Sequence, residues 1–205
     1  MENGSRSKSS EPEIRIVTGE ELRPHLETLA HLRISVFRAF PYLYDGDMAY
    51  EQKYLSTYMD NPAAITVLVL DNGHAVGAST ALPLSDETDE VKAPFLEKGL
   101  NPDEYFYFGE SVLEPSWRGR GLGVRFFLER EAFARKNPQF RYLTFCAVDR
   151  PENHPLRPEN YVPLDRFWEK RGFRKIPEMK TTFHWKDVGH TKETGKSMTF
   201  WIKEL

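Results

Sequence analysis

The segment "RGRGLG" at residues 118–123 combines two cationic side chains with three glycines. It follows the apolar run "YFYFGESVL" (105–113) and precedes a helical pattern. The first N–H groups of a helix have no intrahelical acceptor, and glycines let a phosphate approach them closely. Arg118 and Arg120 would add positive charge for a diphosphate. A tight strand-to-helix turn, in which the glycines adopt positive φ, is the alternative explanation.

Two other phosphate-binding motifs do not fit the chain. The dinucleotide fingerprint G-x-G-x-x-G would require a glycine at Val124. A P-loop ending at residues 195–197 would require a glycine at His190. The pattern that remains is a pair of arginines and a glycine-rich turn at the start of a helix.

The elements around this turn follow from hydrophobic periodicity and turn residues. The predicted strands cover residues 13–17, 63–70, 74–84, 105–113, 141–148, 180–188 and 196–205. The predicted helices cover a segment from Thr18 to the residue before Pro41, a second around residues 54–58, and residues 121–136 and 164–172. Residues 85–104 are expected to form an insertion with one helical turn. This order predicts an α+β protein with a largely antiparallel sheet and one right-handed parallel crossover over residues 105–148.

Local signals mark three of these elements. Thr18 and Glu21 form a capping-box pattern at the start of the first helix. The sequence Asp71-Asn72-Gly73 predicts a hairpin turn. The face of helix 121–136 that is predicted to pack in the core contains Val124, Phe127, Leu128 and Ala132.

Composition and charge limit the classes of function. The 205 residues, 40% hydrophobic and 29% charged, suffice for one domain with its own core. No apolar run approaches the roughly 20 residues of a membrane span, and a net charge of -3 argues against nonspecific nucleic-acid binding. The polar residues 1–12 are expected to be a disordered leader without a signal-peptide core, which predicts a cytoplasmic protein. Cys146, the only cysteine, is expected to be a buried inert thiol, and no histidine spacing predicts a metal.

The sequence "ESVLEPSWRGRGLG" (110–123) resembles the signature of the GNAT superfamily of acyl-CoA-dependent N-acetyltransferases, in which an apolar strand ends before a proline and [Q/R]-x-x-G-x-[G/A] follows. "FWEKRGF" (167–173) is similar to the family's F-Y-x-x-x-G-F. The resemblance covers roughly residues 14–185 and implies that residues 13–205 form a single GNAT-like domain. The implied fold has three layers, namely a mixed, mostly antiparallel sheet with a splayed parallel pair, and helices on both of its faces.

The resemblance also implies acetyl-CoA as the co-substrate. A bulge near Val112 and Leu113 would expose backbone groups that pair with the pantetheine arm, and one N–H there would polarise the thioester carbonyl. The diphosphate would lie on the backbone of the glycine-rich turn, which consists of Arg118, Gly119, Arg120, Gly121, Leu122 and Gly123.

Acetyl transfer to an amine needs a base, because an alkyl ammonium group has a pKa of about 10, and the departing thiolate benefits from an acid. The resemblance points to Glu110 as the base or as an amine-binding carboxylate; a strand-end carboxylate without a role is the alternative. At the position of the family's usual tyrosine acid the chain has Trp168. Tyr161, the nearest phenol in the sequence, is therefore the candidate acid, or else it only packs against Pro163 and Phe167.

The loop after the first helix, where the family commonly binds its acceptor, contains Tyr42, Tyr44 and Asp45. Aromatic and carboxylate side chains suit a cationic amine, although a solvated acidic loop would look the same. The leading hypothesis is an enzyme that transfers the acetyl group of acetyl-CoA directly to a primary amine of a small molecule. A protein lysine or N-terminal acetyltransferase and a noncatalytic acyl-CoA-binding module are the alternatives. The sequence does not specify the amine, and it leaves a homodimer open.

Overall fold

The computed structural model of the protein describes residues 11–205, so residues 1–10 of the predicted leader lie outside the described residues. Within residues 11–205 the strands are β1 (Glu13–Val17), β2 (Ile65–Asp71), β3 (His74–Pro83), β4 (Tyr105–Leu113), β5 (Tyr142–Val148), β6 (Arg174–Lys186) and β7 (Glu193–Glu204). The α-helices are α1 (Leu26–Phe37), α2 (Met48–Asp60), α3 (Asp89–Glu97), α4 (Leu122–Ala134) and α5 (Asp165–Glu169). Short 3-10 helices are η1 (Gly19–His25), η2 (Leu84–Asp86), η3 (Pro102–Glu104) and η4 (Pro115–Trp117).

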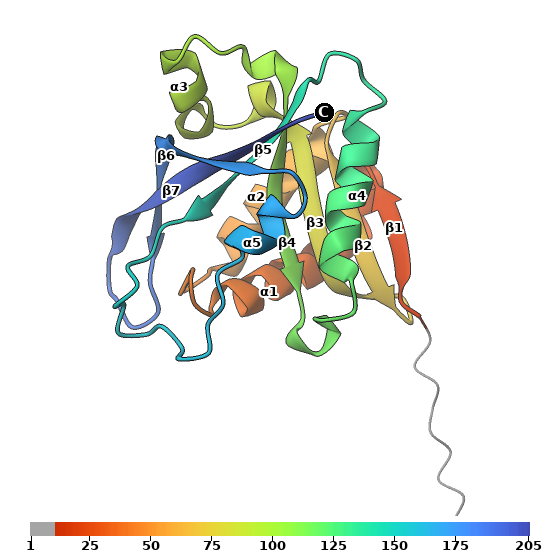
Figure 1. The fold of residues 1–205 in the computed structure, drawn as a ribbon. Coiled ribbons are helices and arrows are strands. Elements are labelled where there is room, and N and C mark those ends of the chain that lie inside the picture. Colours follow the sequence, from red (N-terminus) through yellow and green to blue (C-terminus); the bar gives the residue numbers. More distant parts are fainter. Residues whose placement is uncertain (1–10) are drawn as a thin grey trace, which may run out of the picture.

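The strands form one sheet in the order β1-β2-β3-β4-β5-β7-β6. β4 and β5 are parallel, and every other neighbouring pair is antiparallel. The parallel pairing ends early, at the pair Tyr107 and Thr144, after which β4 and β5 diverge (Figure 1). This confirms the predicted α+β sheet with a splayed parallel pair.

Helices cover both faces of the sheet, so the fold has three layers. In Figure 1, α4 and α5 lie in front of the sheet, and α1 and α2 lie behind it. Each face has its own core: Leu29, Leu55 and Phe200 belong to the core on the α1 and α2 side, and Phe126 and Trp201 belong to the core on the α4 side.

The predicted face of α4 is only partly correct. Phe127 is buried, but Leu128 is 53% exposed, and the buried row includes Phe126 and the charged Arg130. The prediction followed the helical spacing of apolar residues, so it included Leu128 and passed over Arg130, which has buried hydrogen-bond partners.

Two other elements differ in kind, and not only in their bounds, from their predictions. The first helix begins as the 3-10 helix η1, which contains Pro24, and the α-helical geometry starts only at Leu26. The predicted start signal is nonetheless present, because the N–H of Thr18 donates to the Glu21 carboxylate at 3.1 Å. The insertion at residues 85–104 contains a nine-residue helix, α3, and not a single turn.

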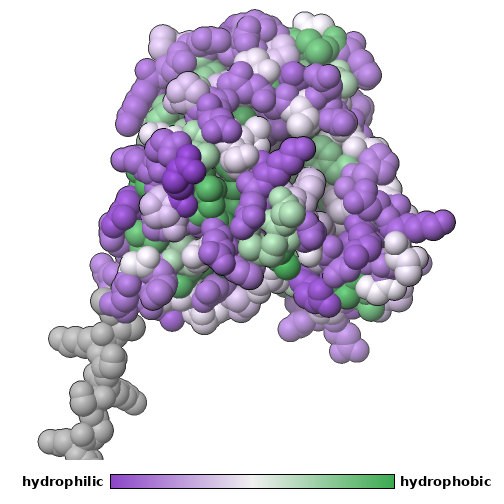
Figure 2. Space-filling model, turned by 180° about the vertical axis from the view of Figure 1, so that it is seen from behind, coloured by the Kyte–Doolittle hydropathy of each residue, from purple (hydrophilic) through white to green (hydrophobic). Residues whose placement is uncertain are grey.

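No helix within residues 11–205 is long and apolar enough to cross a bilayer. Figure 2 shows the face opposite to that of Figure 1, where polar side chains predominate and apolar side chains are visible in the hollows between them. Residues 11–205 also contain no group of three or more His, Cys, Asp or Glu side chains placed to hold a metal ion.

Candidate active site

A cleft of about 1770 Å³ runs through the gap between β4 and β5. Its volume exceeds the roughly 300–1,000 Å³ of an ordinary small-molecule pocket, which leaves room for a cofactor and an acceptor together. The cleft is lined by these predicted site residues: Tyr42, Tyr44, Asp45, Glu110, Leu113, Arg118, Gly119, Gly121, Gly123 and Tyr161. The structure therefore brings most of the predicted site into one cavity.

Three predicted cofactor residues do not direct their side chains into the cleft. Val112 and Leu122 belong to the buried cores. Arg120 stacks its guanidinium over the Trp117 ring at 4.4 Å and donates to the Ser116 carbonyl at 3.1 Å. Backbone groups are what these positions can offer to a ligand.

The predicted bulge in β4 exists, but its predicted position near Val112 and Leu113 is wrong. Those two residues pair in regular register with Ala78 and Gly77. The register shifts instead between Ser111 and Phe108, which pair with Ser79 and Ala81, so that residues 109 and 110 both face residue 80.

A glycine at position 109 makes this bulge possible. A Cβ atom on Gly109 would lie 2.3 Å from the Tyr58 hydroxyl and 2.6 Å from Thr80 Oγ1, which is closer than atoms can approach. The N–H of Glu110 donates to Thr80 Oγ1 at 3.3 Å. The close approach turns the following residue, Glu110, towards the cleft.

Arg130 of α4 holds the bulge from the opposite side of the sheet. Its Nη1 donates to the carbonyls of Thr80 and Glu110 at 3.1 and 3.2 Å, and its Nη2 donates to Ser111 Oγ at 3.0 Å. Burial lowers the pKa of Arg130 to about 9, so the guanidinium stays cationic at neutral pH. A buried cation thus satisfies the carbonyls that the bulge removes from regular pairing.

The glycine-rich turn presents free backbone N–H groups at the start of α4. Gly119 and Gly121 have φ values of 77° and 80°, which favour glycine, and Gly121 is the residue that precedes the helix. Among residues 11–205, the N–H groups from 119 to 123 have no hydrogen-bond acceptor. Consecutive N–H groups of this kind form an anion-binding concavity. The donor set therefore fits a diphosphate.

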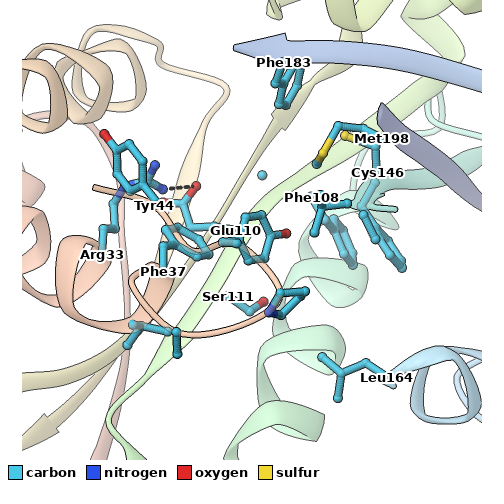
Figure 3. Close-up of a pocket in the computed structure, with 18 of the residues that line it drawn as sticks. Arg33, Phe37, Tyr44, Phe108, Glu110, Ser111, Cys146, Leu164, Phe183 and Met198 are labelled. Atoms are coloured by element: carbon cyan, nitrogen blue, oxygen red, sulfur yellow. Dashed lines mark ion pairs between the residues drawn. The ribbon is translucent and has the colours of Figure 1, made fainter. Parts of the chain in front are cut away.

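Glu110 lies in the cleft beside a buried ion-pair network (Figure 3). Arg33 Nη1 is 2.8 Å from Glu110 Oε2, and the Tyr54 hydroxyl donates to the same oxygen at 2.9 Å. The Nη1 hydrogens do not point at Oε2, so this contact is an ion pair without an aligned hydrogen bond. Arg33 donates through Nε to the fully buried Glu51, and its guanidinium lies 4.1 Å from the centre of the Tyr54 ring. Glu110 is thus held in place by α1 and α2.

The sequence-based prediction missed these partners, although one signal was present. Arg33 lies on the face of α1 that also contains Leu29 and Phe37, at spacings of four residues. A charged residue within an apolar helical stripe indicates a buried ion pair. Burial also raises the pKa of Tyr54 well above its usual value, so this phenol stays a donor.

Tyr161 lines the cleft from the loop before α5. Its ring and the Phe40 ring are nearly perpendicular, with their centres 4.6 Å apart, and the Arg157 guanidinium lies 5.0 Å from the centre of the Tyr161 ring. Burial raises the pKa of Tyr161, so its hydroxyl carries a proton at neutral pH. Trp168 packs against Phe145 at 5.1 Å.

The three predicted acceptor residues have different environments. Tyr42 is half-buried against Phe37, and Tyr44 is half-buried, so burial raises the pKa of both phenols. Asp45 forms ion pairs with Lys186 at 2.8 Å and Arg38 at 3.2 Å, which already neutralise its charge.

Cys146 lies near the point where β4 and β5 separate. Its Sγ atom is 3.2 Å from the Tyr107 hydroxyl, and burial raises the pKa of the thiol to about 12. A thiol with this pKa is uncharged and therefore a poor nucleophile at neutral pH. The expectation of a buried, inert thiol agrees with this environment.

Comparisons with known proteins place this geometry in context. No protein-family model and no curated protein sequence matches the chain. Among solved structures, an acetyltransferase from Thermus thermophilus is similar with a TM-score of 0.55 and 19% identity over 96% of this chain and 99% of that chain. A ribosomal-protein-alanine N-acetyltransferase from Brucella melitensis gives a TM-score of 0.59 and 13% identity over 94% and 99%. NAA60 of Arabidopsis thaliana in complex with acetyl-CoA gives 0.58 and 13% over 94% and 99%.

These neighbours are acetyltransferases, and the fold that they share with this chain is that of the GNAT superfamily. At identities below 20% the similarity establishes the fold and not the reaction. The fold predicted from the motif at residues 110–123 is therefore confirmed.

Proposed function

We propose that the protein is an acetyl-CoA-dependent N-acetyltransferase that transfers the acetyl group directly to a primary amine of a small molecule. One observation carries the proposal. A single cleft follows the edge of β4 that separates from β5, and this cleft contains both the free N–H groups of residues 119–123 and the Glu110 carboxylate. That arrangement suits a long thioester at one end and an amine at the other.

Acetyl-CoA would bind along β4. The N–H groups of residues 119–123, with the charge of Arg118, would hold the diphosphate. The backbone of Val112 and Leu113 would pair with the pantetheine arm on the side that β5 leaves unpaired. When bound, acetyl-CoA supplies the activated acetyl group, and a backbone N–H beside the bulge would stabilise charge on its carbonyl oxygen.

The acceptor would bind at the Glu110 end of the cleft. The Glu110 carboxylate, fixed by Arg33 and Tyr54, would attract a cationic amine, and the rings of Tyr42 and Tyr44 would contact its carbon skeleton. Asp45 would lie beside the bound amine at the rim of the site. Tyr161 would donate the proton that the departing thiolate takes up.

The test is release of free CoA from acetyl-CoA in the presence of spermidine, tyramine or a short peptide with an N-terminal alanine. CoA release with spermidine or tyramine supports the proposal. Release only with the peptide would assign the protein to acetylation of protein N-termini. Binding of acetyl-CoA without release in any mixture would make it a binding module.

A further inference from the structure

Among the other carboxylates that line the same cleft as Glu110 is Glu87. It lies in the short segment between η2 and α3, a few residues after β3 ends at Pro83. Pro83 pairs with Phe106 of β4, and Phe106 also belongs to the short parallel pairing of β4 with β5. Glu87 therefore enters the cleft near the point where the two parallel strands separate.

The segment that carries Glu87 is fixed on both sides. Before it, Asp86 accepts a hydrogen bond from Asn61 Nδ2 at 2.8 Å. After it, the carbonyl of Glu90 accepts a hydrogen bond from Thr181 Oγ1 at 2.6 Å. α3, which follows, lies against β6 at one end of the sheet (Figure 1). These contacts hold the Glu87 backbone between α2 and β6.

The two carboxylates differ in their partners. Glu110 belongs to a buried ion pair, with Arg33 Nη1 2.8 Å from its Oε2 atom. Glu87 accepts one hydrogen bond, from the N–H of Thr88 at 3.2 Å. Within residues 11–205, no lysine, arginine or histidine forms an ion pair with Glu87. This carboxylate can therefore change its charge without breaking a salt bridge.

The surroundings of Glu87 favour proton uptake near neutral pH. Burial raises the pKa of Glu87 to about 7, and the charges of Glu110 and Asp86 act in the same direction, while the Thr88 N–H and Lys92 act against it. The uncharged titratable groups that face it from other elements are Tyr54, Tyr58, Tyr107 and Cys146. Burial raises the pKa of each of these groups, so none of them titrates near pH 7. A general base works best when its pKa lies near the operating pH.

We propose that Glu87 is the catalytic base that takes the proton from the acceptor ammonium, while Glu110 binds and orients the amine. This inference rests on the proposed function. The ammonium gives one proton to the Glu87 carboxylate, and the neutral nitrogen then forms a bond to the acetyl carbon. The carbon–sulfur bond breaks, and its electron pair stays with sulfur. The nitrogen loses a second proton as the amide forms, and the thiolate gains one proton. The products are one amide and one CoA thiol, and Glu87 returns its proton to solvent.

The first experiment is the pH profile of kcat/KM from pH 5.5 to 10 with acetyl-CoA and spermidine, tyramine or the alanyl peptide. For the wild type we expect a tenfold rise per pH unit that levels off at about pH 7. Glu87→Gln should lose this bend and be on the order of 100-fold slower at pH 7. Its rate should instead climb towards pH 10, where the free amine is neutral without a base.

Two further variants separate the roles of the carboxylates. Glu97→Gln, at the exposed end of α3, is the matched control and should follow the wild type. Glu110→Gln should raise the KM of the acceptor and keep the bend, which should move to lower pH because a negative charge facing Glu87 has been removed. A bend that survives in Glu87→Gln, or that disappears in Glu110→Gln, would overturn the assignment.

A readout without turnover is carboxyl NMR of protein labelled with 13C-glutamate. One glutamate signal should titrate near pH 7, and it should be missing from Glu87→Gln and present in Glu97→Gln. If no signal titrates there in the wild type, Glu87 is not the base. If the wild type releases no CoA with any of the three acceptors, the proposed function itself is wrong, and the role of Glu87 with it. Normal turnover with an unchanged profile in Glu87→Gln would refute only the role of Glu87.

Discussion

A methyl group added at Gly121 tests where the diphosphate of CoA binds. Gly121 has a φ of 80°, and no atom lies within 4 Å of the position its Cβ would take. Gly121→Ala should therefore fold without a clash but with a left-handed backbone that costs about 1–2 kcal/mol. In a domain of this size, each kcal/mol lowers the Tm by about 2–4 °C, so we expect a Tm that is lower by roughly 2–8 °C.

The chain offers a matched control for this strain. Gly73, in the turn between β2 and β3, has a φ of 84°, and a Cβ there would also meet no atom within 4 Å. Gly73 does not line the cleft. Gly73→Ala should therefore lower the Tm as Gly121→Ala does, and it should leave the affinity for CoA unchanged.

The affinity for CoA should distinguish Gly121→Ala from Gly73→Ala. The methyl group of Gly121→Ala would project into the turn that presents the free N–H groups, and losing one hydrogen bond to a charged group costs about 1.5–3 kcal/mol. This corresponds to CoA binding that is weaker by roughly 10-fold to 150-fold. Calorimetry with CoA and with 3′-dephospho-CoA, which keeps the diphosphate, should give the same loss. If Gly121→Ala binds both ligands as tightly as Gly73→Ala does, the diphosphate does not bind at this turn.

Three further predictions concern other parts of the site. Tyr161→Phe should lower kcat by about tenfold or more while the Kd of CoA changes little, since only the transition state loses a proton donor; an unchanged kcat would limit Tyr161 to packing against Phe40. Arg130→Met leaves the carbonyls of Thr80 and Glu110 without donors and should lower the free energy of unfolding by about 2–4 kcal/mol in urea titrations, and a loss below about 1 kcal/mol would contradict its role at the bulge. Because burial raises the pKa of Cys146 to about 12, a thiol reagent should react with it at pH 8 only after unfolding, and rapid reaction of the folded protein would show that the thiol is accessible.

The sequence was sufficient for the fold because its signals are local. Alternating apolar residues, the Asp71-Asn72-Gly73 turn and the motif at residues 110–123 predict strands, a hairpin and a parallel crossover, and the sheet contains all three. The bulge was predicted near residues 112 and 113, and it lies three residues earlier, at 109 and 110. The bulge depends on how closely Gly109 approaches Tyr58 of α2, and no sequence pattern within β4 indicates that approach.

The interaction partners of the site residues were harder to predict from the sequence than the elements on which these residues lie. Glu110 was predicted as a base or an amine-binding carboxylate, and it lines the cleft, but the sequence around it gives no indication that Arg33 compensates its charge. Glu87 lies in an acidic insertion that looks like a solvated loop, and it enters the cleft only because Asn61 and Thr181 anchor the residues on either side. Long-range contacts of this kind decide what a carboxylate can do, and they come from the assembled fold.

The splayed strands explain why the site needs two carboxylates with different partners. Where β4 leaves β5, the bulge that turns Glu110 into the cleft also places it beside α1 and α2, whose Arg33 and Tyr54 fix its position. A fixed, charged carboxylate binds a cation well, but removing the proton of that cation requires a group that can become neutral. Glu87, which forms no ion pair among the described residues, is such a group, and it lines the same cleft. In this proposal, binding of the amine and removal of its proton are therefore carried out by separate side chains.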